Sequence, residues 1–156
     1  MRSLATSPAI RVDAGLALLR VATGVIFAAH GAQKLFVYGF GGVTGAFAGM
    51  GVPLPGITGP LVALLEFFGG LAIVAGLLTR LAGVGLSITM LGAIGLVHLG
   101  AGFFNPNGVE FPLALFSASA ALALTGAGRY SLDALLFRGR SEPISAQPAP
   151  TIRKAA

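Results

Sequence analysis

The fold class is decided by the stretch Ala14–Phe36, which reads AGLALLRVATGVIFAAHGAQKLF. It is long enough to cross the hydrocarbon core of a bilayer, yet four polar residues interrupt it: Arg20, His30, Gln33 and Lys34. At 100° per residue, one side of a helix would carry, within an arc of about 80°, Arg20, Thr23, Phe27, His30 and Lys34. Because an ionisable side chain is costly against acyl chains, this side is expected to turn toward the interior of a bundle.

The composition of the whole chain is that of an integral membrane protein. Of its 156 residues, 55% are hydrophobic and only 10% are charged, and the mean hydropathy is +0.89. A soluble domain carries about a quarter of its residues as charged types. Three more apolar runs follow the first, so the sequence predicts an all-α, antiparallel four-helix bundle in the lipid bilayer.

Charge and cysteine content exclude several classes of partner and cofactor. The net charge is +5, but the basic residues stand at the ends of apolar runs and form no patch with interleaved aromatic residues. We therefore expect no nucleic acid partner. The chain contains no cysteine, which excludes a disulfide framework and also excludes an iron–sulfur cluster or a thiolate-bound metal on this chain.

Four spanning helices are predicted, at about residues 14–36, 60–78, 81–102 and 110–126. Asp13 is the expected N-cap of the first helix, and Thr58-Gly59-Pro60 is the expected start of the second. The very short turn Thr79-Arg80 predicts that the second and third helices lie antiparallel side by side. The run Asn105-Pro106-Asn107-Gly108 predicts the turn before the fourth helix.

The connection between the first two helices is rich in glycine. Residues 37–59 contain eight glycines and two prolines, so a continuous helix is not expected there. Because the segment remains apolar, it is predicted to be a loop in or near the membrane interface, with at most one short helix near Val43 to Met50. The simplest interpretation is a connector that covers the bundle.

The two ends of the chain differ from the apolar centre. Residues 1–13 form a short basic leader, and residues 129–137 predict a short amphipathic helix on the membrane surface with Ser131 as its N-cap. Residues 138–156 contain prolines, serines and alanines typical of a disordered tail. The membrane domain is therefore assigned to residues 14–137.

Basic residues also predict the orientation of the chain. Positive charge is concentrated in the leader, in the turn at Arg80 and in the segment after the fourth helix, whereas the other two connections carry only Lys34. The positive-inside rule then places both termini in the cytoplasm and the glycine-rich connection outside. The predicted location is the inner (plasma) membrane, with several passes.

Depth along the helices brings five ionisable residues together near the outer face. At 1.5 Å per residue, His30 and Lys34 lie about 24 and 30 Å along the first helix, and Glu66 lies about 9 Å below the outer end of the second. The full predicted group is His30, Lys34, Glu66, His98 and Glu110. Gln33 shares this level about 100° around the helix from Lys34, whereas Arg20 lies about 9 Å from the cytoplasmic end.

This group predicts a site for proton exchange or ligand binding. Glu66 either pairs with Lys34, Arg20 or a histidine, or stays neutral and exchanges a proton; a purely structural ion pair is the alternative. The candidate catalytic residues are Glu66, His98 and His30, and the candidate ligand-binding residues are Lys34, Glu110, Gln33 and Arg20. Arg20 and Lys34 could instead reach the membrane surface as anchors.

A small redox-active ligand suits this set of residues. An imidazole and a carboxyl group can give and take the two protons of a quinone ring. A haem held by His30 and His98 is a less favoured alternative, and no other metal site is predicted.

An ordered set of motifs extends through residues 14–137. It comprises Leu19-Arg20, His30-Gly31-x2-Lys34, Glu66-x2-Gly69-Gly70, Gly76-x2-Thr79-Arg80, His98, Glu110 and Gly126-x-Gly128-Arg129-Tyr130-Ser131-Leu132-Asp133. Together these motifs resemble the DoxX family of small bacterial and archaeal membrane proteins. The resemblance implies a four-helix inner-membrane protein. Members include the membrane subunit of a thiosulfate:quinone oxidoreductase, and others associate with redox or sulfur-handling partners in oxidative-stress defence.

Three functional hypotheses follow. The first is a membrane subunit of a quinone-linked redox system that works with a redox or sulfur-transfer partner protein. The second is a non-enzymatic membrane adaptor or assembly factor in which the polar cluster only fixes helix packing; self-association is compatible with both. A small transporter is the third and is disfavoured because no inverted repeat or pair of broken helices is evident.

Overall fold

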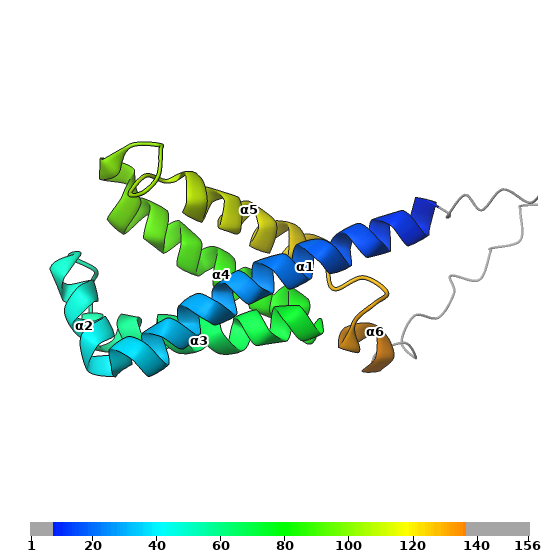
Figure 1. Ribbon diagram of the computed structural model, residues 1–156, viewed down its shortest axis with the longest axis horizontal. Helices are drawn as coiled ribbons and strands as arrows, with labels where there is room; N and C mark the ends of the chain where they lie inside the picture. The colour runs from blue at the N-terminus through cyan, green and yellow to red at the C-terminus, as the bar shows by residue number, and fades with distance from the viewer. Residues whose placement is uncertain (1–7, 137–156) are drawn as a thin grey trace, which may run out of the picture.

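The computed structural model describes residues 8–136, and no strand occurs within them, which confirms the all-α prediction (Figure 1). The helices are α1 (Pro8–Ala32), a π-helical turn (Gln33–Tyr38), α2 (Gly39–Gly49), α3 (Pro55–Ala75), α4 (Thr79–Ala93), a second π-helical turn (Ile94–His98), a 3-10 turn (Leu99–Ala101), α5 (Glu110–Thr125) and α6 (Leu132–Leu136). The predicted tail at residues 138–156 and most of the leader lie outside the described residues.

Three of the described helical segments are long and apolar enough to cross a membrane: Pro8–Gly49, Pro55–Ala75 and Thr79–Ala101. The fourth apolar helix, α5, has 16 residues. At 1.5 Å per residue it measures about 24 Å, somewhat less than a typical hydrocarbon core. The described chain is therefore a membrane helical bundle with three full-length spans and one short apolar helix.

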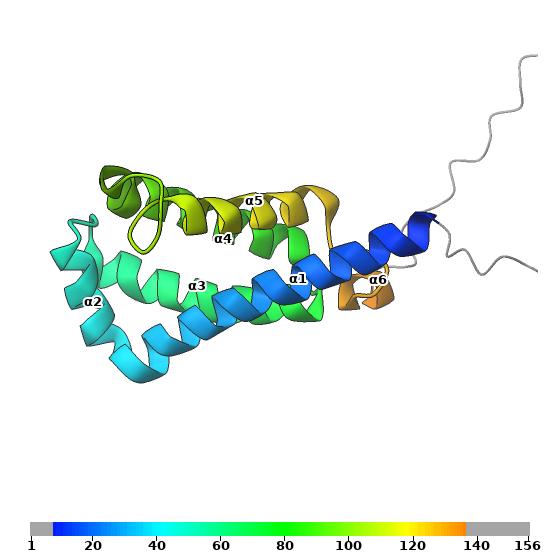
Figure 2. The ribbon, with the colours of Figure 1, turned by 45° about the horizontal axis from the view of Figure 1, so that its top comes forward.

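Two helix pairs form the bundle. In both views, α1 lies beside α3 and α4 lies beside α5 (Figures 1 and 2). Glycines bring the backbones of each pair together: a Cβ on Gly31 would overlap the backbone of Phe67, and a Cβ on Gly70 would overlap that of Ala28. Small residues at such contacts are expected in lipid, where close packing replaces the hydrophobic drive that operates in water.

The first helix is longer than predicted. It begins at Pro8 instead of Ala14, so the predicted leader of residues 1–13 is wrong over its last residues. Asp13 lies within the helix and does not cap it. Its carboxylate instead accepts a hydrogen bond from the backbone N–H of Arg129, at 3.1 Å, and so links the first part of α1 to the segment between α5 and α6.

The glycine-rich connection contains the one helix expected near Val43 to Met50, but this helix begins earlier, at Gly39. Gly39 takes a positive φ of 64°, which breaks the direction of the helix, and the chain then continues as α2. Val43 is only 2% exposed and lies against Gly59 of α3. Packing on α3 thus stabilises a helix whose glycine content alone would disfavour it.

The starts of α3 and α4 also differ from prediction. Helix α3 begins at Pro55, five residues before the predicted start, and the Thr58 hydroxyl donates to the carbonyls of Pro53 and Leu54 instead of capping a helix at Pro60. Helix α4 begins at Thr79. Its first free N–H groups, on Leu78 and Thr79, donate to the carboxylate of Asp133 at 2.7 and 3.0 Å.

The C-terminal segment is short and tightly held. Ser131 caps α6 as predicted, since its hydroxyl accepts a hydrogen bond from the N–H of Ala134 at 3.1 Å. Arg20 of α1 holds the preceding turn: its guanidinium donates to the carbonyls of Ala127 and Tyr130 at 3.2 and 2.7 Å. Arg20 is 5% exposed. One end of the bundle is therefore closed by side chains bonded to backbone groups.

Close backbone contact between α1 and α3 predicts a stability difference between two glycines. Gly70→Ala should destabilise the protein by about 1–3 kcal/mol, because its Cβ can fit only if the helices move apart. Gly15→Ala is the matched control, since open space surrounds Gly15 in α1 and alanine favours a helix. Thermal unfolding in mild detergent measures both. Equal melting temperatures for the two variants would contradict the packing described here.

The two hydrogen bonds of the Arg20 guanidinium predict that the segment after α5 becomes more mobile when Arg20 is replaced. Arg20→Lys should increase hydrogen–deuterium exchange in residues 127–136, because a lysine ammonium cannot reproduce the spread of the guanidinium donors to two carbonyls. Arg80→Lys, at an exposed position, is the control and should leave exchange unchanged. Unchanged exchange in both variants would show that Arg20 does not hold this segment.

Candidate functional site

An ion pair between α1 and α3 lies at the centre of the candidate site. Lys34, in the π-helical turn that follows α1, pairs through its Nζ with Oε2 of Glu66 on α3. The Glu66 side chain is 5% exposed and that of Lys34 is 21% exposed. Among the partners that the sequence left open for Glu66, the structure therefore selects Lys34. Arg20 is bonded to backbone carbonyls instead.

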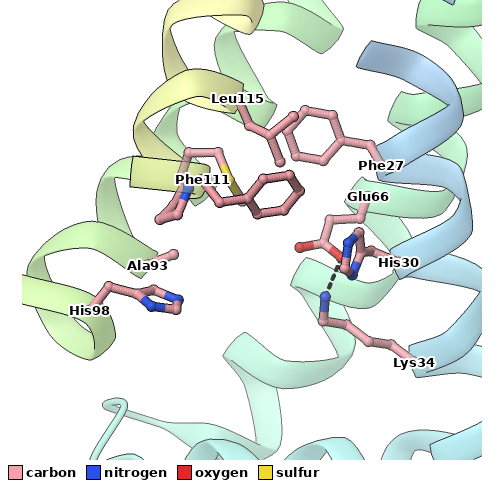
Figure 3. Close-up of a pocket in the computed structure, with 10 residues that line it drawn as sticks. Phe27, His30, Lys34, Glu66, Ala93, His98, Phe111 and Leu115 are labelled. Atoms are coloured by element: carbon pink, nitrogen blue, oxygen red, sulfur yellow. Dashed lines mark hydrogen bonds and ion pairs between the residues drawn. The ribbon is translucent and has the colours of Figure 1, made fainter. Parts of the chain in front are cut away.

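A cavity of about 240 Å³ lies beside this pair. Lys34, Glu66, His30 and His98 supply its polar wall, and Figure 3 shows His98 facing the ion pair from the opposite side. The remaining lining residues are apolar: Phe27, Met90, Ala93, Phe111, Pro112 and Leu115. The cavity thus combines two imidazoles, an ammonium and a carboxylate with a largely apolar surround, which is the usual character of a small-molecule site.

His98 is oriented by the loop before α5. Its Nδ1 lies 2.8 Å from the carbonyl oxygen of Asn107. Because a carbonyl can only accept, Nδ1 carries the proton in this contact and Nε2 remains for the cavity. A neutral His98 then presents an acceptor to a ligand, and a protonated His98 presents a donor.

His30 lies at the exposed edge of the same cavity. Its ring is tilted against Phe111 of α5, with ring centroids 6.1 Å apart. Within residues 8–136, its ring nitrogens have no hydrogen-bond partner. Both nitrogens of His30 are therefore available to a ligand at the cavity mouth.

Both sides of the cavity are positioned by π-helical turns. Lys34 lies in the turn Gln33–Tyr38, and His98 ends the turn Ile94–His98. A π turn widens the helix by one residue and redirects the side chains that follow, and such turns occur frequently at functional sites. The sequence did not indicate either turn, since neither has a composition that distinguishes it from the surrounding α-helix.

Three predicted site residues lie apart from this cavity. Glu110 accepts a hydrogen bond from the N–H of Asn105 at 2.8 Å and so supports the loop before α5. Gln33 is exposed and lines neither described cavity. Arg20 is bonded to Ala127 and Tyr130, beyond the end of α5, and so lies away from the cavity. Sequence reasoning placed Phe27 on the same side of its helix as His30 and Lys34 but missed the rest of the apolar lining, including Phe111.

The burial of the ion pair predicts strong coupling between its two residues. A double-mutant cycle with Lys34→Met and Glu66→Gln measures this coupling. The two losses in unfolding free energy should be non-additive by more than about 1 kcal/mol, because either single change leaves the other side chain unpaired in a low-dielectric setting. Chemical or thermal unfolding in detergent gives the four values. Additivity within about 0.5 kcal/mol would mean that the pair is not formed in the folded protein.

Comparison with protein families gives two matches. The DoxX model matches residues 15–99, and a model described as TQO small subunit DoxD matches residues 58–147. No solved structure matches.

Three similar proteins come from distant bacteria. The first, named "Putative oxidoreductase CatD", is from Bacillus subtilis and is 38% identical over 129 residues, covering 82% of this chain and 91% of the relative. Inner membrane protein YqjF of Escherichia coli is 36% identical and covers 80% and 93%. Uncharacterized membrane protein Rv3486 of Mycobacterium tuberculosis is 33% identical and covers 77% and 80%. The resemblance found in the motifs is confirmed: the chain is a membrane protein of the DoxX family.

Proposed function

We propose that this protein is the inner-membrane subunit of a redox system and that the cavity beside Lys34 and Glu66 binds a quinone ring. The observation that carries this proposal is the meeting of an ion pair and two imidazoles on one cavity inside an apolar helical bundle. Polar groups that converge on a largely apolar pocket are the usual starting point for a functional assignment. The name of one relative, the Bacillus subtilis protein, and the description of the DoxD model agree with a redox setting.

The residues present fit a quinone ring. A quinone carbonyl accepts hydrogen bonds, and the Lys34 ammonium and a protonated His98 are donors from opposite sides of the cavity. Phe27 and Phe111 offer apolar surface for the ring faces. When bound, a quinone would supply a redox couple, because its reduction to the quinol takes up two electrons and two protons. The chain itself has no cysteine, so a thiol or iron–sulfur electron carrier would reside on a redox or sulfur-transfer partner protein.

The protein groups would bind, orient and exchange protons. Nε2 of His98 can take a proton from a ring hydroxyl, because its Nδ1 is already committed to Asn107. Glu66 is shielded and held by Lys34, so a proton delivered to the carboxylate would release the lysine for a stronger contact with a ligand oxygen. His30 at the cavity mouth connects this cluster with the surroundings.

The orientation of the chain is part of the proposal. Positive charge in the turn at Arg80 and near Arg129 favours a cytoplasmic position for that end of the bundle. The cavity is lined by the last turns of α1 and α4 and the first turns of α5, away from Arg80 and Arg129, and would therefore lie near the outer face of the inner membrane. A partner outside the cytoplasm or within the membrane could then exchange electrons with a ring bound there.

One observation favours the adaptor hypothesis as a second candidate. Lys34 and Glu66 satisfy each other's charge without a ligand, as a purely structural pair would. In that case the cavity would bind no redox compound, and substitution of Glu66 would reduce any cellular activity only in proportion to the loss of folded protein.

A direct test is to purify the protein in mild detergent, record its visible spectrum and measure extracted quinone by mass spectrometry. The proposal predicts quinone in near-equal amount to protein, and at least tenfold less quinone per folded protein in Glu66→Gln and His98→Leu. Ser117→Ala, exposed on α5, is the control and should retain quinone. A haem absorption band would favour the bis-histidine alternative. Quinone no higher than in detergent extracts without the protein would refute the proposal.

A further inference from the structure

A second cavity, of about 460 Å³, lies on the other side of the ion pair. Its walls come from α2 and the turn that follows it, from α3 and from the outer part of α4; Phe47, Leu61 and Ile88 represent these three walls. Lys34, Glu66 and His98 line both cavities. The two spaces therefore meet at the polar cluster.

The second cavity is suited to an apolar occupant. Two threonine hydroxyls lie on its wall, but that of Thr58 donates to the carbonyl of Pro53 at 3.0 Å and that of Thr89 donates to the carbonyl of Gly85 at 3.2 Å. With these donors already bonded, the polar groups left for a ligand are the three that it shares with the first cavity. A polar ligand would lose its hydration here without gaining partners.

The volumes indicate how one ligand would divide between the two spaces. Ligand cavities typically measure about 300–1,000 Å³, so the polar cavity at about 240 Å³ suits a ring and little more. The apolar cavity at about 460 Å³ lies within that range and adjoins it. An amphiphile with a compact polar ring and a long apolar chain matches this division.

We propose that the second cavity holds the isoprenoid tail of the quinone whose ring binds beside Lys34 and Glu66. This inference rests on the proposed function and narrows its substrate class to quinones that carry a long chain. Phe47 of α2 and Met50 of the turn that follows it line the cavity, so this segment covers the tail. Because lipid chains are as apolar as the cavity wall, the cavity selects its ligand by shape and direction of entry more than by a gain in hydrophobic burial.

Two glycines on the same helical segment provide a matched pair of test variants. Gly92 of α4 lines the apolar cavity, and no atom lies within 4 Å of a Cβ built there, so the Gly92→Leu side chain starts in open space at the cavity wall. Gly95, three residues later, has equally open space but lines neither described cavity, so Gly95→Leu is its control. Both changes replace glycine within a helical segment by a better helix former.

The experiment measures binding of two quinones to the full chain in lipid nanodiscs: one with a ten-isoprene tail and one with the same ring and no tail. Gly92→Leu should weaken binding of the tailed quinone at least tenfold while changing that of the tailless ring less than twofold, and Gly95→Leu should change neither.

The outcomes separate this inference from the proposed function. If the wild type binds both quinones but Gly92→Leu weakens both equally or neither, the tail does not lie in the second cavity, although the ring site stands. If Gly92→Leu displaces a co-purified phospholipid and leaves both quinones bound, the cavity holds a lipid chain and the inference is overturned. If the wild type binds neither quinone, the proposed function fails and the inference fails with it.

Discussion

The pairing of Lys34 with Glu66 is the interaction on which the rest of the structure depends. A carboxylate inside an apolar helix is tolerated only with a partner, and the nearest ammonium is supplied by a π-helical turn at the end of α1. The glycine contacts between α1 and α3 bring these helices close enough for the pair to form. Helix packing and charge pairing thus impose the same alignment of α1 and α3. Both cavities adjoin the ion pair that this alignment produces.

The two ends of the bundle use polar side chains in different ways. At one end, Arg20 donates hydrogen bonds to backbone carbonyls and Asp133 accepts them from backbone N–H groups. Most of the polar atoms of these two side chains are therefore already bonded within the protein. At the other end, His30 and His98 retain ring nitrogens that face a cavity, and α2 folds back over an apolar space. Both ends carry ionisable residues within apolar helices, but only the second leaves them accessible to a small molecule.

The sequence predicted the elements whose signals are local. The start of α5 at Glu110, the cap at Ser131 and the grouping of His30, Lys34, Glu66 and His98 all followed from spacing and polarity. It failed where distant contacts decide the outcome: packing of Val43 on α3 makes a helix of the glycine-rich connection, and Asp133 sets the start of α4 from 54 residues away. Glu110 lies at the same predicted depth as the cluster, but its carboxylate accepts a hydrogen bond from the loop before α5. The depth of a residue along a helix does not predict the direction of its side chain.

The proposed site places a redox-active ring between the ion pair and His98. Photo-cross-linking with an azido-quinone, followed by peptide mass spectrometry, tests it most directly because it reports position without relying on variants. We expect labelled peptides that contain Lys34, Glu66 or residues 90–98, with labelling suppressed by excess unmodified quinone. Labelling spread over the outward surfaces of α1 and α5, or insensitive to competing quinone, would contradict the claim.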